Sequence, residues 1–394
     1  MAVVHAGAPA AAGTPPSPGD RQCSGAGRVV GLDGIRGLAA LYVVVHHCWL
    51  LTFPGYPANT GPGWLGWLVY GRLAVVAFIV LSGFSLAISP ARDAWRLGGT
   101  LRFARRRAWR ILPPYWAALA VSLVIASVVP SLPLSAPPTL RSVVVYGLLM
   151  QDVVAAPAPN GAFWSIAVEV GLYLVFPVLV LIRRRAGAVA TLAAVTVPVV
   201  VIGLLCRDLS TTARATGYTL ELAPLFTAGV LAAGVVAAPE RIRRLPWHRL
   251  AALAAVPVLL LVVVQGSVWT VRHYYWVDLA AGPAIALFLA AVATRRPAGL
   301  VRLLDSRPLR AIGGFSFSLY LIHLPIVALI SRRVVAPHLG SGLPAFWATL
   351  VVAVPICLMA ARGFAALVET PFQRRRPGEP RTTAGRRGPE EKTG

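Results

Sequence analysis

Apolar runs of membrane-spanning length recur along almost the whole chain of 394 residues. A transmembrane helix needs roughly 20 predominantly apolar residues, and only helices and closed barrels satisfy their backbone polar groups inside a membrane. The pattern therefore predicts an all-α, polytopic membrane helical bundle with about ten transmembrane helices. The predicted spans lie near residues 34–53, 69–89, 111–130, 162–182, 186–206, 217–238, 250–269, 274–293, 313–331 and 343–366.

An eleventh apolar stretch, 142–156, is short and contains Gln151 and Asp152. If this stretch crossed the membrane, the basic clusters that follow it would lie on the opposite side from the cluster that precedes it. We therefore expect a re-entrant or interfacial segment, and ten crossings place both chain ends in the cytoplasm. The expected location is the inner (plasma) membrane.

The composition excludes a soluble enzyme of ordinary design. Hydrophobic residues make up 57% of the chain and charged residues 13%, whereas soluble domains carry about a quarter charged residues. Residues 1–30 are rich in Ala, Gly and Pro, and 374–394 in Arg, Pro and Gly. We expect both to be disordered cytoplasmic tails that flank one membrane domain, 31–373.

The charge balance is strongly basic, with 37 basic and 14 acidic residues and a net charge of +23. The arginines gather between the apolar runs, at 105–107, 183–185, 241–244 and 374–376. This distribution is typical of cytoplasmic loops, which makes a nucleic-acid partner the weaker interpretation. Membrane lipids are the expected partners, and no obligate protein partner is indicated.

The cysteines do not indicate a metal centre or a disulfide framework. The chain has four of them, at Cys23, Cys48, Cys206 and Cys357. No two have the spacing of metal ligands or of a redox pair. We therefore expect no metal site.

Two ionisable residues share one face of the first predicted span. His47 follows Arg36 by eleven residues, which at ~100° per residue is three turns plus roughly 20°. The rise of ~16 Å places His47 near mid-bilayer when Arg36 lies at the cytoplasmic edge. His46 points ~80° away. Ionisable groups inside a membrane are costly, so Arg36 and His47 are candidate functional residues.

Glu169 lies in the fourth predicted span, ~10 Å from the outer end of that span and at a depth comparable with that of His47. His323 also falls near mid-depth, with Tyr320 one turn before it. A histidine within reach of a carboxylate in a low-dielectric site is suited to general base catalysis. The alternative is structural: histidines that hydrogen-bond between helices, and an Arg36 side chain that reaches the interface.

The arginine-rich segment between the second and third spans carries a further candidate pair. If the segment is helical, Arg107 and Arg110 are three residues apart and share a face. Two guanidinium groups on one face can bind phosphates through bidentate hydrogen bonds. The alternative is a topology signal that also binds anionic lipid.

Six short segments follow one another along the chain. They are LDGIRGLAAL with Arg36 and, beyond it, His47; FIVLSGF; Arg107 to Arg110; FWSIAVEVGLYLVFP with Trp164, Ser165, Glu169 and Tyr173; FSFSLYLIHLPI with Ser318, Tyr320, His323 and Pro325; and VETPF with Glu369 and Pro371. Together they resemble the acyltransferase-3 family of membrane O-acyltransferases, from about residue 31 to 373. One position departs from the family pattern, because Val170 stands where a second glutamate is usual after Glu169.

The resemblance implies transfer of an acyl group, usually acetyl, from acyl-CoA to a hydroxyl of a carbohydrate-type acceptor. The donor is a co-substrate, and no tightly bound cofactor is implied. The acceptor could be a surface polysaccharide or glycolipid, or a macrolide-type natural product. We expect the membrane unit itself to recognise it.

The resemblance also assigns roles to individual residues. Arg107 and Arg110 would bind the CoA phosphates, with Arg36 nearer the thioester. His47 would deprotonate the acceptor hydroxyl or carry the acyl group transiently, and Glu169 would orient the acceptor or His47. The expected substrate-binding residues are Trp164, Ser165, Tyr173, Tyr320 and His323.

Two other classes of protein fit the same pattern of apolar spans and buried polar groups. A transporter or exporter of a carbohydrate or antibiotic would use the midplane polar groups as a substrate path. A structural membrane protein would use them only to hold its helices together. Labelling of an acceptor that depends on acyl-CoA would separate the enzyme from both.

Overall fold

The computed structural model describes residues 28–205 and 219–374, and these residues form helices and connecting loops without a strand. The two tails predicted at the chain ends fall almost entirely outside the described residues. The same holds for Cys23, Cys206 and the basic positions 375–376. Cys48 and Cys357 are buried and free.

Eight helices are long and apolar enough to cross a membrane in the described part of the chain. They are α1 (Leu32–Thr52), α2 (Arg72–Arg92), α3 (Thr100–Val128), α5 (Trp164–Leu205), α9 (Trp247–Arg272), α10 (Tyr274–Ala293), the continuous segment of α13 (Ser316–Leu329), η3 (Ile330–Val335) and α14 (Ala336–Leu339), and that of α15 (Leu343–Phe364), η4 (Ala365–Glu369) and α16 (Thr370–Arg374).

Shorter helices complete the bundle between these long ones. They are η1 (Gly63–Tyr70), α4 (Leu140–Gly147), α7 (Leu222–Ala232), η2 (Ala233–Ala237), α8 (Glu240–Arg243), α11 (Ala298–Leu304) and α12 (Arg307–Gly314).

The helices confirm the predicted all-α bundle, and a helical segment overlaps each of the ten predicted ranges. The 42-residue α5 is bent at Gly187, whose backbone is non-helical with φ of 87°. The segments on either side of this bend correspond to the predicted spans 162–182 and 186–206. The shorter apolar helix Leu222–Ala237 corresponds to the span predicted at 217–238.

One boundary differs in a way that matters for the site. The third long helix begins at Thr100, well before the predicted 111. Arginine is a good helix former, so the basic segment continues the apolar helix toward its N-terminus instead of forming a loop. Arg107 and Arg110 therefore lie on α3 itself, where a spacing of three residues puts them on one face.

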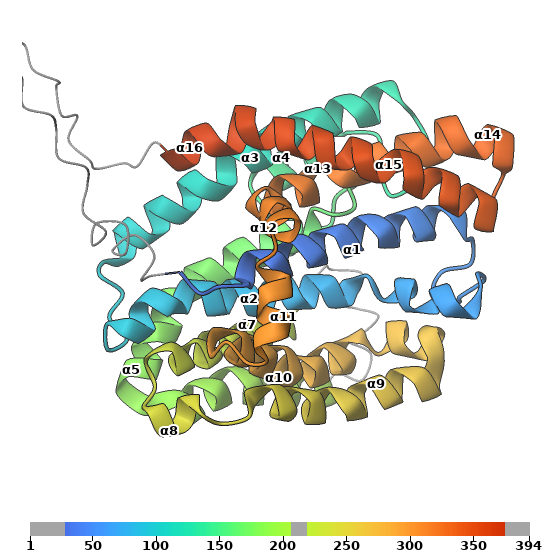
Figure 1. Cartoon of the computed structure of the whole chain (residues 1–394). Helices are drawn as coiled ribbons and strands as arrows, with labels where there is room; N and C mark the ends of the chain where they lie inside the picture. Colours follow the sequence, from blue (N-terminus) through green and yellow to red (C-terminus); the bar gives the residue numbers. More distant parts are fainter. Residues whose placement is uncertain (1–27, 206–218, 375–394) are drawn as a thin grey trace, which may run out of the picture.

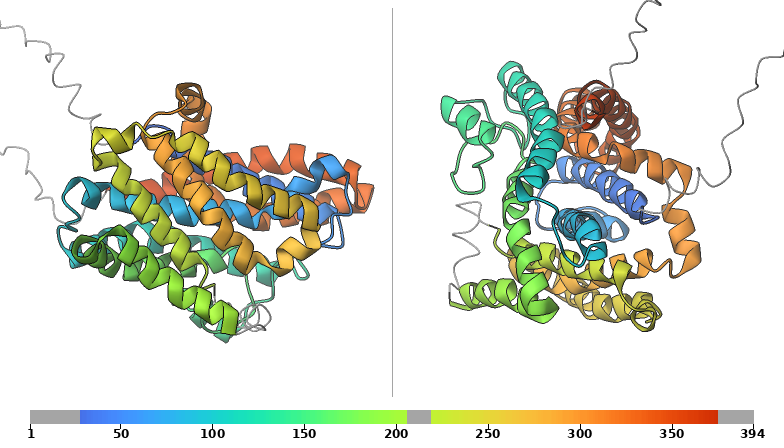
Figure 2. Two further views of the ribbon diagram at one scale, coloured as in Figure 1. Left: turned by 90° about the horizontal axis from the view of Figure 1, so that it is seen from below. Right: turned by 90° about the vertical axis from the view of Figure 1, so that its left-hand side faces the viewer.

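Helices α1 and α2 occupy the centre of the bundle (Figures 1 and 2). On one side, α1 contacts α13 and α15; on the other, α2 contacts α7 and α10. The α2–α7 contact is close because Gly83 faces a carbonyl: a Cβ at this position would lie 2.1 Å from the oxygen of Phe226. The start of α3, the bend of α5 and α8, which carry three of the predicted arginine clusters, lie at one end of the bundle (Figure 1).

The segment predicted as re-entrant or interfacial, 142–156, overlaps α4, a helix of eight residues. At ~1.5 Å per residue this helix is ~12 Å long, too short to cross a membrane. Thr139 caps its N-terminus, and the loop after it is held by Gln151, whose amide donates to the carbonyl of Phe163 at 3.0 Å. Burial, followed by the neighbouring Glu221 carboxylate, raises the pKa of Asp152 in this loop to about 6.

Candidate functional site

Two cavities lie along α1 and α2, one toward each end of the bundle. The first, of about 630 Å³, is lined by α1, α2, α3, α5 and α13 and contains Arg36, Arg107 and Arg110. We call it the arginine cavity. The second, of about 750 Å³, contains His46 and His47 and is called the histidine cavity.

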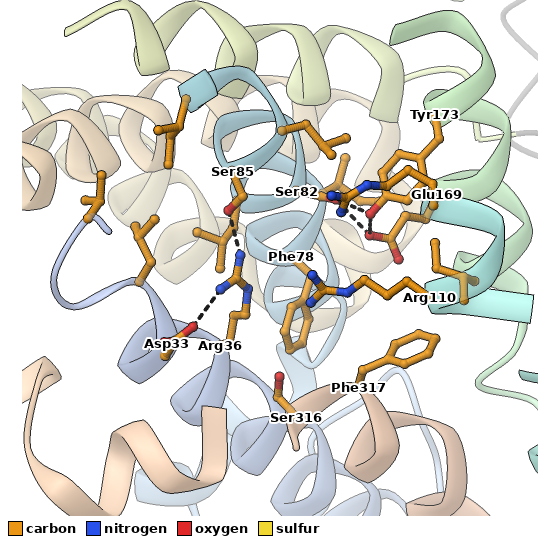
Figure 3. A pocket seen from close by; sticks show the side chains of 18 of the residues that line it. Asp33, Arg36, Phe78, Ser82, Ser85, Arg110, Glu169, Tyr173, Ser316 and Phe317 are labelled. Carbon is orange, nitrogen blue, oxygen red and sulfur yellow. Dashed lines mark hydrogen bonds and ion pairs between the residues drawn. The ribbon is translucent and has the colours of Figure 1, made fainter. Parts of the chain in front are cut away.

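Arg36 is held in the arginine cavity by two hydrogen bonds (Figure 3). Its guanidinium donates to Asp33, 2.8 Å away on the same helix, and to the hydroxyl of Ser85 on α2, 2.6 Å away. Asp33 is also paired with Arg28. Because both ends of the guanidinium are engaged, Arg36 bridges α1 and α2 in a fixed orientation.

Arg107 and Arg110 project into the same cavity from α3, and Figure 3 shows Arg110 and Arg36 in one pocket with Phe78 between them. Arg107 Nε is buried and has no hydrogen-bond partner among the described residues. The charged residues that line this cavity are five arginines and three carboxylates. A cavity with this excess of guanidinium groups suits an anionic ligand.

Glu169 of α5 also lines the arginine cavity. Its Oε1 accepts a hydrogen bond from the hydroxyl of Ser82 at 2.7 Å and another from Tyr173, one turn along the same helix (Figure 3). Tyr173 and Ser82 are themselves 2.6 Å apart. The carboxylate is therefore fixed by two hydroxyl groups on the same side of the site as the arginines.

His47 lines the histidine cavity, and the structure does not bring it together with Glu169. Its neighbour is His323 of α13, whose Nε2 lies 3.2 Å from His47 Nδ1. His323 is fully buried behind His47 and lines neither cavity. The side chain that contacts His47 from another helix is therefore His323 of α13, and not the expected Glu169 of α5.

The hydrogen bonds fix the tautomer of both rings. Nδ1 of His47 is 2.8 Å from the carbonyl of Val43, and a carbonyl only accepts, so this nitrogen carries the proton. Nδ1 of His323 likewise donates to the carbonyl of Tyr320 at 2.7 Å, leaving its Nε2 to accept from His47. Within the described part of the chain, both polar contacts of His47 use Nδ1. Nε2 is then the basic nitrogen of this ring.

The remaining predicted substrate-binding residues divide between the cavities. Ser165 and Tyr173 line the arginine cavity, and Trp164 lines the histidine cavity. Tyr320 lines both. The predicted residues thus line two separate cavities, a division that the sequence did not reveal.

A buried charged cluster at the wall of the histidine cavity was missed. Arg72, at the start of α2, donates to Asp278 and to Glu221, both at 2.7 Å. Its guanidinium also lies over the rings of Trp164 and Tyr274, at 4.9 and 5.3 Å. The rule that singled out Glu169, a charge inside an apolar span, also applies to Arg72 and Asp278 and could have found them.

The last two sequence motifs, FSFSLYLIHLPI and VETPF, contact each other at the end of the bundle that holds the arginine cavity. Ser318 of α13 donates to the buried Glu369, which also accepts from Gln373 at 2.7 Å. Next to it, Phe372 packs edge-on against Trp109 of α3, with ring centroids 5.6 Å apart. These contacts attach the terminal helix to α3, the helix that carries Arg107 and Arg110.

Comparison with known proteins gives the class of this membrane protein. A family model described as an acyltransferase domain matches residues 29–362. The chain belongs to this family, the acyltransferase-3 family, as the six motifs indicated. With its apolar helices it is a multi-pass membrane protein.

Individual relatives are distant. The chain is 24% identical over 374 residues to the O-acetyltransferase OatA of Staphylococcus aureus, covering 88% of this chain and 57% of OatA. It is 27% identical over 341 residues to the acyltransferase MdmB of Streptomyces mycarofaciens, covering 79% of this chain and 82% of MdmB. The chain thus spans a little over half the length of OatA. No solved structure matches it.

Proposed function

We propose that the protein is an integral membrane O-acyltransferase that moves an acyl group, acetyl in the first instance, from acyl-CoA to a hydroxyl of a carbohydrate-type or macrolide-type acceptor. One observation carries the proposal: along the same two helices, a cavity rich in arginine lies next to a cavity lined by His47, whose ring is hydrogen-bonded to His323 behind it. The family and the names of the relatives support O-acyl transfer as the reaction class.

The arginine cavity is the proposed donor site. CoA carries phosphate groups, which Arg107 and Arg110 can bind through charge-assisted hydrogen bonds. The buried Arg107 Nε, without a partner among the described residues, supports a ligand that supplies acceptor oxygens. Arg36 lies deeper along α1 and is fixed by Asp33 and Ser85, so it is suited to orient the thioester end.

The histidine cavity is the proposed acceptor site. Its aromatic lining offers faces and hydroxyl groups suited to a ring with several hydroxyls; the aromatic residues are Tyr56, Trp164, Tyr274, Tyr275 and Tyr320. Nε2 of His47 takes the proton of the acceptor hydroxyl as its oxygen attacks the thioester carbonyl. The imidazolium that forms is stabilised through Nδ1–H by the carbonyl of Val43 and by Nε2 of His323.

The reaction balances without any further reactant. A C–O bond forms, the tetrahedral carbon collapses, and the C–S bond breaks so that CoA leaves as a thiolate into the arginine cavity. The proton taken by His47 balances the one that the thiolate gains, and the products are the O-acyl acceptor and free CoA. An acyl-His47 intermediate would use the same Nε2 atom.

The function is tested first by acetyl-CoA binding to the protein purified in nanodiscs. We expect saturable binding, weakened at least tenfold in the double variant Arg107→Ala with Arg110→Ala because two charge-assisted phosphate contacts are lost. A matched control removes Arg105 and Arg106, which are exposed on the same helix and line neither cavity. Absence of binding by folded wild-type protein, or equal weakening by the control, would contradict the donor site.

The same proposal sets the orientation in the inner membrane. Acyl-CoA is cytoplasmic, so the arginine cavity, the basic clusters and both chain ends belong on the cytoplasmic side. A cysteine at exposed Ala155, in a background with the native cysteines replaced, should react with an impermeant thiol reagent added outside. Labelling only from the cytoplasmic side would reverse this orientation.

A further inference from the structure

The two cavities share Val75 of α2 and Tyr320 of α13 as lining residues, and the two lining sets have no other residue in common. On α1 the arginine cavity ends at Arg36 and the histidine cavity begins at Val43. Any group that passes from one cavity to the other therefore meets Val75 and Tyr320. These two side chains form the partition between the cavities.

The partition is fixed in place. The hydroxyl of Tyr320 donates to the carbonyl of Ala162 at 2.9 Å and is hydrogen-bonded to the hydroxyl of Ser165 at 2.7 Å. The ring meets Phe78 edge-on, with centroids 6.1 Å apart. Val75 and Tyr320 are each only 7% exposed. A ring whose hydroxyl is hydrogen-bonded and which packs against Phe78 does not swing aside, so the partition has a defined shape.

The geometry of acyl transfer gives this partition a chemical role. In the tetrahedral intermediate the carbonyl carbon bears four groups, three of which are the sulfur, the attacking oxygen and the alkyl group. If CoA occupies the arginine cavity and the acceptor the histidine cavity, sulfur and oxygen lie on opposite sides of the partition. The alkyl group then has no cavity of its own and must pack against the partition itself.

We propose that Val75 and Tyr320, with Phe78 beside them, form the acyl pocket of this enzyme and restrict it to short, unbranched acyl groups. This inference rests on the proposed function and adds to it the residues that select the acyl chain. Val75 and Tyr320 are buried and Phe78 is partly buried, so the pocket has apolar walls that suit a methyl group and leave little room for a longer chain. Val75 is the smaller wall, so its side chain sets the permitted length.

The effect of changing Val75 has a definite sign and size. A hydrophobic pocket discriminates one methylene by roughly 10- to 200-fold. Val75→Ala removes two methyl groups from the wall and should admit a chain longer by about two carbons. Val75→Ile adds a methyl group and should exclude even a two-carbon chain. Because the two variants act in opposite directions, a general loss of stability cannot imitate both.

The experiment measures binding of CoA, S-ethyl-CoA and S-butyl-CoA to the protein in nanodiscs by calorimetry. These thioethers carry no reactive carbonyl, so no acceptor is needed. In wild type, S-butyl-CoA should bind at least tenfold more weakly than S-ethyl-CoA. Val75→Ala should remove this difference, and Val75→Ile should weaken S-ethyl-CoA relative to CoA. CoA itself should bind equally to wild type and both variants.

The matched control is Val76→Ala, the same substitution one residue along α2. Val76 is fully buried and lines neither cavity. The Val76→Ala variant should therefore prefer S-ethyl-CoA over S-butyl-CoA to the same extent as wild type. The acyl pocket would be overturned if Val75→Ala kept the wild-type preference for S-ethyl-CoA over S-butyl-CoA, or if Val76→Ala lost that preference as well. Binding of CoA itself would still support the donor site in either case. No binding of CoA or of either thioether would overturn the proposed function as well.

Discussion

His323 lies directly behind His47: its Nε2 is 3.2 Å from Nδ1 of His47, while its own Nδ1 donates to the carbonyl of Tyr320 at 2.7 Å. The two rings form a chain of hydrogen bonds that begins at a backbone carbonyl and ends at the cavity. A second histidine thus occupies the position where many hydrolytic sites have a carboxylate. It orients His47 without placing a second formal charge in the membrane.

This relationship predicts that His47 and His323 differ in the size of their contribution. His47→Ala removes the proposed base and should lower the rate of transfer by roughly 100- to 10,000-fold, the contribution typical of general base catalysis. His323→Ala should lower kcat about tenfold and shift the pH–rate profile, because His47 keeps its bond to Val43. Initial rates of CoA release across pH measure both effects. Full activity of His47→Ala would remove it from the mechanism.

Glu169 should act on the donor side of the reaction. Glu169→Gln keeps an oxygen that accepts from Ser82 and Tyr173 but removes the charge from the arginine cavity. We expect folded protein with a changed KM for acyl-CoA and a pH–rate profile like that of wild type, since Glu169 does not contact His47. A profile shifted as in His323→Ala would instead couple Glu169 to the histidine pair.

The Arg36–His47 relationship could be predicted because helical geometry is local. Residues eleven apart share a face in any straight helix, and both side chains do line cavities along α1. The partner of His47 could not be predicted in the same way. Hydropathy gives the depth of a residue in the membrane, but it does not say which helices are neighbours. Glu169 and His323 were equally good candidates by depth.

The charged cluster around Arg72 shows a second limit. Its partners Asp278 and Glu221 lie 206 and 149 residues further along the chain. Arg72 falls near the outer edge of its predicted span, where an arginine can reach the interface without a partner. Arg72 is brought to Glu221 and Asp278 only because α2 packs against α7 and α10. Pairings of this kind depend on the tertiary fold and are invisible to local patterns.

Asp152 makes stability depend on pH. Burial and the nearby Glu221 raise its pKa from 3.8 to about 6 in the folded protein, so the folded state holds this proton over a range in which the unfolded state has released it. Stability should therefore fall as pH rises through this window. Asp152→Asn removes the buried charge and should raise Tm at about pH 8 but not at about pH 4. Equal gains at both pH values would exclude this carboxyl as the cause.

Arg72 should be the main stabilising residue of the histidine cavity. Arg72→Met leaves the buried carboxylates of Asp278 and Glu221 without their counter-charge, and breaking such a pair costs about 3–5 kcal/mol. Arg72→Lys keeps the charge but cannot donate in two directions from one rigid fork, so its loss should be intermediate. Thermal unfolding in detergent measures both.

The control for Arg72 is Arg102→Met, which removes an exposed arginine from the start of α3 and should change Tm little. Adding Asp278→Asn to Arg72→Met should recover part of the lost stability, because one of the two uncompensated charges is then gone. If the double variant is less stable than Arg72→Met, Asp278 stabilises the fold through contacts other than its ion pair. If Arg72→Met unfolds at the wild-type temperature, the carboxylates need no counter-charge, and the cluster does not stabilise the wall of the cavity.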